Sequence, residues 1–143
     1  MKNIKLFPHF VGGPGAVGLL VLRFVFGLGM MYHGVDKIKN PFGWMGAQSD
    51  IPGILQAAAA VSEFAGGAAL IFGLLTPLAA LGIAATMLVA YFKAHLGDPF
   101  VAKEGRSFEL AALYFSAAFA LLATGPGKLS LDYPLFKKFA LKG

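Results

Sequence analysis

Hydrophobic residues along this chain gather in four stretches of about 20 residues, separated by short polar segments. Each residue of an α-helix advances the chain by about 1.5 Å, so about 20 apolar residues are enough to span the hydrocarbon core of a bilayer. The pattern predicts membrane-spanning helices at about residues 15–38, 54–75, 77–96 and 107–124. We therefore expect an all-α fold, an integral membrane four-helix transmembrane bundle, with residues 1–143 forming a single domain.

The boundary between the second and third helices is predicted from Gly73, Thr76 and Pro77. Residues 64–92 carry no charge, and one helix of that length would extend about 43 Å, beyond the roughly 30 Å of a bilayer core. The stretch must therefore fold back on itself. Gly73 is suited to ending a helix, Thr76 to capping the next one, and Pro77 to its first turn.

Composition also favours a membrane location. Hydrophobic residues make up 57% of the chain and charged residues 13%, and the mean hydropathy is +0.71. A soluble domain carries about 25% charged residues, because its surface must be hydrated. The lipid bilayer is thus the first partner that the sequence predicts. The polar segments are too short to form a separate domain outside the membrane, so any chemistry belongs to the bundle, its ends or a partner protein.

The net charge of +5 comes mainly from lysines in the predicted loops and tail. Attraction to anionic lipid explains that placement, and no nucleic acid partner is expected. Residues 133–143 form a short basic amphipathic segment suited to the bilayer surface. Basic residues are nearly balanced between the two sides of the membrane, and the segment after the fourth helix carries a single acid, Asp132. We expect a multi-pass protein of the cytoplasmic membrane with both termini in the cytoplasm.

The chain contains no cysteine. This excludes disulfides, thiolate nucleophiles, cysteine-bound iron–sulfur clusters and covalently attached haem c within the chain. A redox function would therefore depend on electrons from a substrate or from a soluble partner.

Arg23 and Glu63 are charged residues that each lie alone inside a long apolar stretch. A charge at the bilayer centre costs roughly 3 kcal/mol or more on insertion scales, so it is normally kept where it faces a partner, a cavity or a site. Counting depth along the helices, we expect the two side chains to meet near the middle of the membrane. Two interpretations are open: an ion pair that fixes helix register, or a site that moves protons or holds an anionic or quinoid oxygen.

Four more ionisable residues are predicted at one end of the bundle, namely His33, Lys37, His95 and Glu109. A single histidine there is more typical of a side chain bonded to a carbonyl at the lipid boundary, and Lys37 is expected to extend toward water. Together with Glu63, these groups are suited to carrying protons or binding a substrate. No His-x-x-x-His or Glu-x-x-His spacing puts two metal ligands on one helix, so no metal site is predicted.

Glycines and the sole tryptophan add two structural expectations. Gly27 and Gly34 fall on the same stripe of the first helix as Arg23, and Gly66 and Gly67 keep the second helix slim, so these helices can approach closely. Trp44 lies in the loop at residues 40–52. An interfacial position and core packing are both compatible with it.

Several of these residues form an ordered set. The set consists of Arg23-x-x-x-Gly27, His33-Gly34-x-x-Lys37, Glu63-x-x-Gly66-Gly67, Gly73-Leu-Leu-Thr76 and Gly125-Pro-Gly-Lys-Leu-Ser-Leu-Asp132. In order and spacing it resembles the DoxX family of small bacterial membrane proteins, over about residues 15–132. The resemblance implies four transmembrane helices and a bacterial inner-membrane location. The family is related to the membrane subunit of an archaeal thiosulfate:quinone oxidoreductase.

The resemblance and the isolated charges give the leading hypothesis, the membrane subunit of a quinone-linked redox system, in which the chain is an oxidoreductase subunit. Its predicted catalytic residues are Arg23, which would stabilise charge on a quinone oxygen, and Glu63 and His33, which would deliver protons. Electrons would come from a soluble oxidoreductase partner or from the substrate. The predicted substrate-binding residues are Arg23, Lys37, Glu63, His95 and Glu109.

Two alternatives belong to other classes. One is a noncatalytic membrane scaffold that tethers soluble oxidoreductases, with Arg23 and Glu63 as a structural lock. The other is a small transporter or metal-handling protein that uses the histidines and glutamates at the end of the bundle. A homo-oligomer is compatible with each of them.

Overall fold

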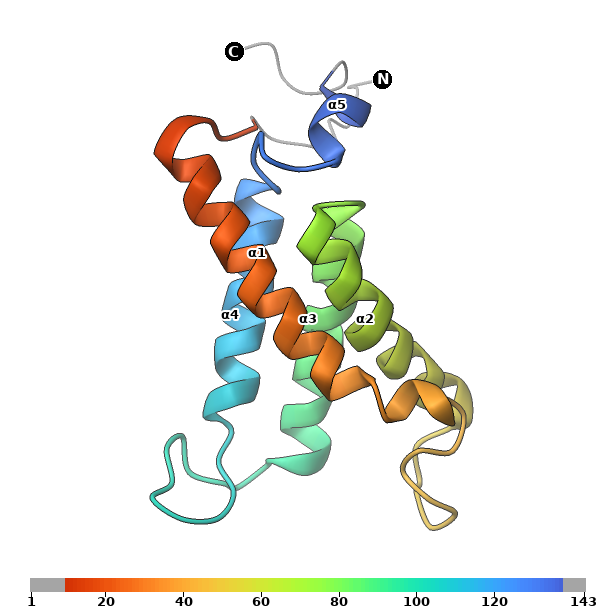
Figure 1. Cartoon of the computed structure of the whole chain (residues 1–143). Helices are drawn as coiled ribbons and strands as arrows, with labels where there is room; N and C mark the ends of the chain where they lie inside the picture. Colours follow the sequence, from red (N-terminus) through yellow and green to blue (C-terminus); the bar gives the residue numbers. More distant parts are fainter. Residues whose placement is uncertain (1–9, 138–143) are drawn as a thin grey trace, which may run out of the picture.

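The computed structural model describes residues 10–137. Its helices in chain order are α1 (Gly13–Gly34), the short 3₁₀ helix η1 (Lys37–Lys39), α2 (Gly53–Phe72), α3 (Thr76–Ala94), α4 (Glu109–Thr124) and α5 (Asp132–Phe136). The four long helices alternate in direction (Figure 1). The α2–α3 turn and α5 lie at one end of the bundle, here called the terminal end. The connections before α2 and before α4 lie at the other, here called the loop end.

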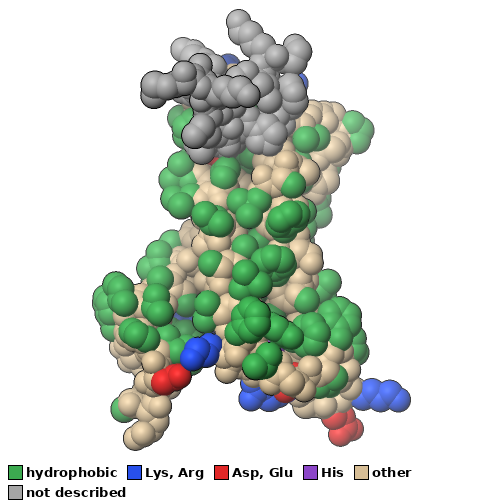
Figure 2. All heavy atoms as spheres, turned by 180° about the vertical axis from the view of Figure 1, so that it is seen from behind, with side chains coloured by type: hydrophobic (Ala, Val, Ile, Leu, Met, Phe, Trp, Pro, Cys, Tyr) green, Lys and Arg blue, Asp and Glu red, His purple; other side chains and the backbone are tan. Residues whose placement is uncertain are grey.

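The outer surface of the bundle is apolar. Helices α1, α2 and α3 have 22, 20 and 19 residues and are long and apolar enough to cross a membrane, and α4 is an apolar helix of 16 residues. Val25 and Leu78 are 64% and 67% exposed, and Figure 2 shows such side chains over the height of one face, with charged groups gathered at the loop end. A water-soluble monomer rarely exposes so continuous an apolar surface. The predicted all-α, four-helix membrane bundle is confirmed.

Helices α1 and α2 pack through glycine. A Cβ atom on Gly27 would lie 2.5 Å from the carbonyl oxygen of Gly67, and one on Gly67 would lie 2.6 Å from the carbonyl oxygen of Gly27. A Cβ on Gly34 would lie 2.6 Å from the backbone nitrogen of Phe64. Only glycine allows two backbones to approach so closely. The predicted glycine contact between these helices is confirmed, whereas Gly66 faces α3 instead.

One apolar cluster joins all four long helices. It includes the buried side chains of Phe26 and Met30 from α1, Leu70 from α2, Ile83 from α3 and Leu121 from α4. Lipid tails are as apolar as these side chains, so inside a bilayer close packing holds such a cluster together more than exclusion from water does. The bundle therefore depends on shape, which is why the glycine positions matter.

The predicted helix boundaries need two corrections. The first helix was expected to reach residue 38, but α1 ends at Gly34, and Lys37 opens the separate turn η1. Gly73 ends α2 in the left-handed conformation (φ 63°) and Pro77 lies in the first turn of α3, as predicted. Thr76 does not cap α3, because its Oγ1 is buried and makes no hydrogen bond. The predicted basic tail at residues 133–143 lies partly outside the described residues.

Candidate functional site

Arg23 is fully buried, and its side chain reaches the terminal end of the bundle. Its Nη1 donates a hydrogen bond to the carbonyl oxygen of Leu70 (3.4 Å), and its Nη2 donates to that of Leu129. The guanidinium lies directly against Gly73, where a side chain would collide with it. Asp132 is the acid that interacts with it electrostatically. Arg23 therefore ties α1 to the end of α2 and to the segment that follows α4.

Asp132 caps α3 from 56 residues away in the sequence. Its carboxylate accepts hydrogen bonds from the backbone N–H groups of Leu75 (2.7 Å) and Thr76 (2.8 Å). These groups lie at the start of α3, where a helix leaves donors unpaired and favours negative charge. The N–H of Asp132 in turn donates to the carbonyl oxygen of Gly73 (2.8 Å). We call Arg23, Gly73 and Asp132 the clasp; its aspartate supplies the cap that was predicted for Thr76.

Glu63 is the buried charge of the loop end, with a side chain 2% exposed. The ammonium nitrogen of Lys37 lies 2.7 Å from each carboxylate oxygen. It hydrogen-bonds Oε1 and faces Oε2 only as an ion-pair partner, so Oε2 has no hydrogen bond of its own. The side chain of Lys37 is 24% exposed. The pair therefore links a buried carboxylate to the water at this end of the bundle.

Trp44 covers this ion pair from the loop between η1 and α2. The ammonium of Lys37 lies 4.5 Å from the centre of the indole ring, a cation–π contact. The indole Nε1 donates to the carbonyl oxygen of Gln56 (2.9 Å). Trp44 is half-buried, so it packs on charged and polar groups and takes part in neither the apolar core nor a bare interfacial anchor. We call Lys37, Trp44, Gln56 and Glu63 the loop-end site.

The predicted meeting of Arg23 with Glu63 is wrong. Helical side chains tilt toward the N-terminus of their own helix. Because α1 and α2 are antiparallel, Arg23 points toward the terminal end and Glu63 toward the loop end. Leu70, which accepts a hydrogen bond from Arg23, lies two helical turns from Glu63, about 10 Å along α2. The two charges thus belong to different sites.

His33 lies in the last turn of α1 at the loop end. Its ring meets that of Tyr114 edge-on, with centroids 5.6 Å apart, and its side chain is exposed. It makes no hydrogen bond or ion pair with Lys37 or Glu63. The structure places His33 beside the site without joining it to the charged pair, and its role in proton delivery stays a prediction.

His95 and Glu109 also lie at the loop end, on the far side of the bundle. The Nδ1 of His95 lies 2.9 Å from a carboxylate oxygen of Asp98, and the same oxygen lies 3.4 Å from Nε of Arg106. Glu109 is the half-buried first residue of α4. Within residues 10–137, no three histidine, aspartate or glutamate side chains are grouped as a metal site would require.

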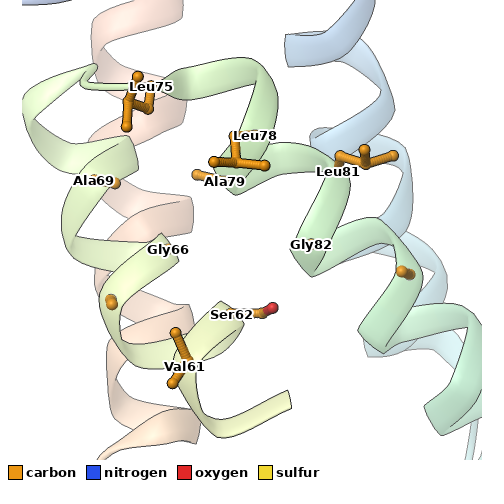
Figure 3. A pocket seen from close by; sticks show the side chains of 11 residues that line it. Val61, Ser62, Gly66, Ala69, Leu75, Leu78, Ala79, Leu81 and Gly82 are labelled. Atoms are coloured by element: carbon orange, nitrogen blue, oxygen red, sulfur yellow. The ribbon is translucent and has the colours of Figure 1, made fainter. Parts of the chain in front are cut away.

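A groove of about 380 Å³ opens between α2 and α3 on the outside of the bundle (Figure 3). Its lining includes Gly66, Ala69, Leu78 and Gly82, and the hydroxyl of Ser62 is its polar side-chain group. None of the predicted site residues lines it. The groove is part of the apolar outer surface and lies apart from the ionisable groups.

Sequence analysis missed Gln56, whose amide holds the loop that carries Trp44. A signal was present, since Gln56 is the one amide side chain within an otherwise apolar helix. Asp132 was noted only as the acid of the last segment. Its capping role could not be read locally, because donor and acceptor lie far apart in the sequence.

Comparisons with known proteins agree with this architecture. The profile of the DoxX family matches residues 18–96, which include Arg23, Lys37 and Glu63. The chain is 34% identical over 129 residues to the inner membrane protein YqjF of Escherichia coli strain K12, covering 86% of this chain and 95% of that protein. No solved structure matches the chain significantly. With a family match over more than half of its length and a relative aligned along nearly all of it, this chain belongs to the DoxX family.

Proposed function

We propose that this protein is the membrane subunit of a quinone-linked redox system in the cytoplasmic membrane, with its substrate site at Lys37, Trp44 and Glu63. The observation that carries the proposal is the buried carboxylate of Glu63, which has one oxygen free of hydrogen bonds and is joined to a partly exposed ammonium. Trp44 adds an aromatic face beside that ammonium. A planar ring bearing carbonyl oxygens fits this combination of groups.

The proposed chemistry is the reduction of a quinone to a quinol, which adds two electrons and two protons. The electrons come from a soluble oxidoreductase partner or from that partner's substrate. The Lys37 ammonium donates a hydrogen bond to a quinone oxygen and then a proton as negative charge develops there. Water at the loop end returns the proton to Lys37, and Glu63 stabilises its ammonium form. The second proton follows the same route.

The other predicted residues take different parts in this proposal. Arg23 moves from substrate binding to structure, because its Nη groups are bonded to backbone carbonyls at the opposite end. His33, His95 and Glu109 share the loop end with the site and would exchange protons with water there. The name of the Escherichia coli relative supports the inner-membrane location. The orientation with both termini in the cytoplasm stays a prediction.

The experiment is to purify the protein in mild detergent, identify bound quinone by mass spectrometry of the organic extract, and measure binding of added ubiquinone and menaquinone. We expect the wild type to bind a quinone and the Glu63→Gln variant to lose it with helix content unchanged. Glu104→Gln, at an exposed glutamate of the α3–α4 loop, is the matched control and should bind like the wild type. Equal binding by both variants, or no binding by the wild type after addition, would contradict the proposal.

The clasp favours a second candidate, the noncatalytic scaffold. It fixes the segment before α5 to the α2–α3 turn and so gives the terminal end a defined surface. A protein that tethers soluble oxidoreductases needs such a surface and no quinone. A dehydrogenase that copurifies equally with wild type and Glu63→Gln, from a wild type that binds no quinone, would support it. No comparable observation within residues 10–137 favours a transporter or a metal-handling protein.

A further inference from the structure

We infer that residues 40–52 form a lid over the Lys37–Glu63 pair, and that Gln56 is the positioning residue that holds this lid closed. Trp44 forms the inner face of the lid. The inference builds on the proposed location of the substrate site, but it is independent of which substrate binds there.

Gln56 uses every polar atom of its side chain to hold the lid. Its Oε1 accepts the backbone N–H of Met45 (3.1 Å), and its Nε2 donates to the carbonyl oxygen of Ile51 (2.9 Å). Its backbone oxygen accepts the indole N–H of Trp44. The residue is 4% exposed, and a buried amide is tolerated only when its hydrogen bonds are made. The amide therefore has a specific task, and its three bonds hold the lid at three positions.

The rest of the lid has little else to hold it in place. Its backbone forms a chain of local turns, such as the bonds from Gly43 to Asn40 (3.1 Å) and from Gly46 to Gly43 (3.0 Å). An ion pair between Asp50 and Lys93 (3.1 Å) reaches α3, but both side chains are exposed, so it adds little. Because local turns do not attach a loop to its neighbours, the amide of Gln56 is the main attachment.

The lid controls access to the buried carboxylate. Glu63 is 2% exposed, and the groups between it and the loop end are the Lys37 ammonium and the Trp44 ring. A substrate ring can reach Glu63 only after one of them moves. The hydrogen bonds of Gln56 resist that motion, so their strength sets how often the site opens.

The test uses the fact that Trp44 is the only tryptophan of the chain, so that its fluorescence reports the lid directly. We compare Gln56→Ala with Gln48→Ala, which removes an exposed glutamine from the same lid. The readouts are acrylamide quenching of tryptophan fluorescence and the rate at which an amine-reactive reagent modifies Lys37, followed by peptide mass spectrometry. Far-UV circular dichroism checks that the helices are intact.

We expect Gln56→Ala to increase both readouts by roughly fivefold, the shift in the open–closed equilibrium that the loss of one net hydrogen bond produces. Gln48→Ala should match the wild type. Unchanged quenching and unchanged Lys37 reactivity in a folded Gln56→Ala protein would overturn the inference. Since no quinone is added, this result is separate from a failure of the proposed function.

A second variant covers the case in which Gln56→Ala does not fold. Gln56→Glu keeps an acceptor for the N–H of Met45 but cannot donate to the carbonyl oxygen of Ile51. We expect both readouts to rise, by less than a complete loss of the amide would cause. If Gln56→Glu folds and behaves as the wild type does, the amide does not position the lid.

Discussion

The two ends of the bundle each bury a charge, and they satisfy it in different ways. At the terminal end, Arg23 donates to backbone carbonyls, and the carboxylate of Asp132 accepts from backbone N–H groups. At the loop end, Glu63 is paired with the flexible side chain of Lys37, which is partly open to water. A charge bonded to backbone cannot change partners without unfolding the chain around it. A charge bonded to a mobile side chain can, and this difference separates a structural site from a candidate functional one.

The two sites also differ in what they connect. The clasp joins three segments that are distant in sequence: the middle of α1, the α2–α3 turn and residues 129–132. The loop-end site joins η1 and α2, which are consecutive helices (Figure 1). Loss of the clasp should therefore affect the whole fold, whereas loss of the loop-end pair should act locally.

The largest effect is expected for Arg23→Ala. The change removes two hydrogen bonds and leaves the buried Asp132 without its basic partner, which costs about 3–5 kcal/mol of unfolding free energy. The control is Arg106→Ala, at an exposed arginine of the α3–α4 loop, with an expected cost below about 1 kcal/mol. The measurement is unfolding by SDS titration in mixed micelles, followed by circular dichroism. Equal costs for the two variants would show that the clasp does not hold the fold.

A smaller effect is expected for Asp132→Asn. The amide can accept one of the two backbone N–H groups at the start of α3, but its NH₂ group faces the other donor. We expect a loss of about 2–3 kcal/mol in the same titration, together with faster hydrogen exchange at the amides of Leu75 and Thr76. Asp36→Asn, at an exposed aspartate paired with Lys39, is the control and should change neither quantity. Unchanged exchange at the start of α3 would refute the cap.

The helices of this fold could be predicted because each of the signals is local. The length of each apolar stretch gave its helix, and Gly73 with Pro77 gave the turn between α2 and α3. The error at the end of α1 has a local cause as well. Residues 35–38 continue the apolar pattern, but the chain tightens into η1 there, and composition does not distinguish the two kinds of helix.

The site was harder to predict because partners are chosen in three dimensions. Depth along the helices placed Lys37 and Glu63 at one end correctly, but it paired Glu63 with Arg23. The direction in which each side chain leaves its helix decides the pairing, and antiparallel neighbours send their side chains to opposite ends. The cap from Asp132 depends on how the segment after α4 folds back, which no local pattern contains. Such contacts need the structure.

The loop-end pair should respond asymmetrically, because its two members differ in exposure. Lys37→Met leaves the carboxylate of Glu63 buried without a donor, with an expected cost of about 1–2 kcal/mol in the SDS titration. Glu63→Gln leaves a lysine that is already partly exposed and can extend into water, with an expected cost below about 1 kcal/mol. Both variants should lose quinone binding. The double variant should be more stable than the sum of the two single changes implies, because with Glu63 neutral the loss of Lys37 strands no charge. Equal costs, additive in the double variant, would mean that the pair is no more coupled than a surface salt bridge, and the contrast between the two ends of the bundle would then fail.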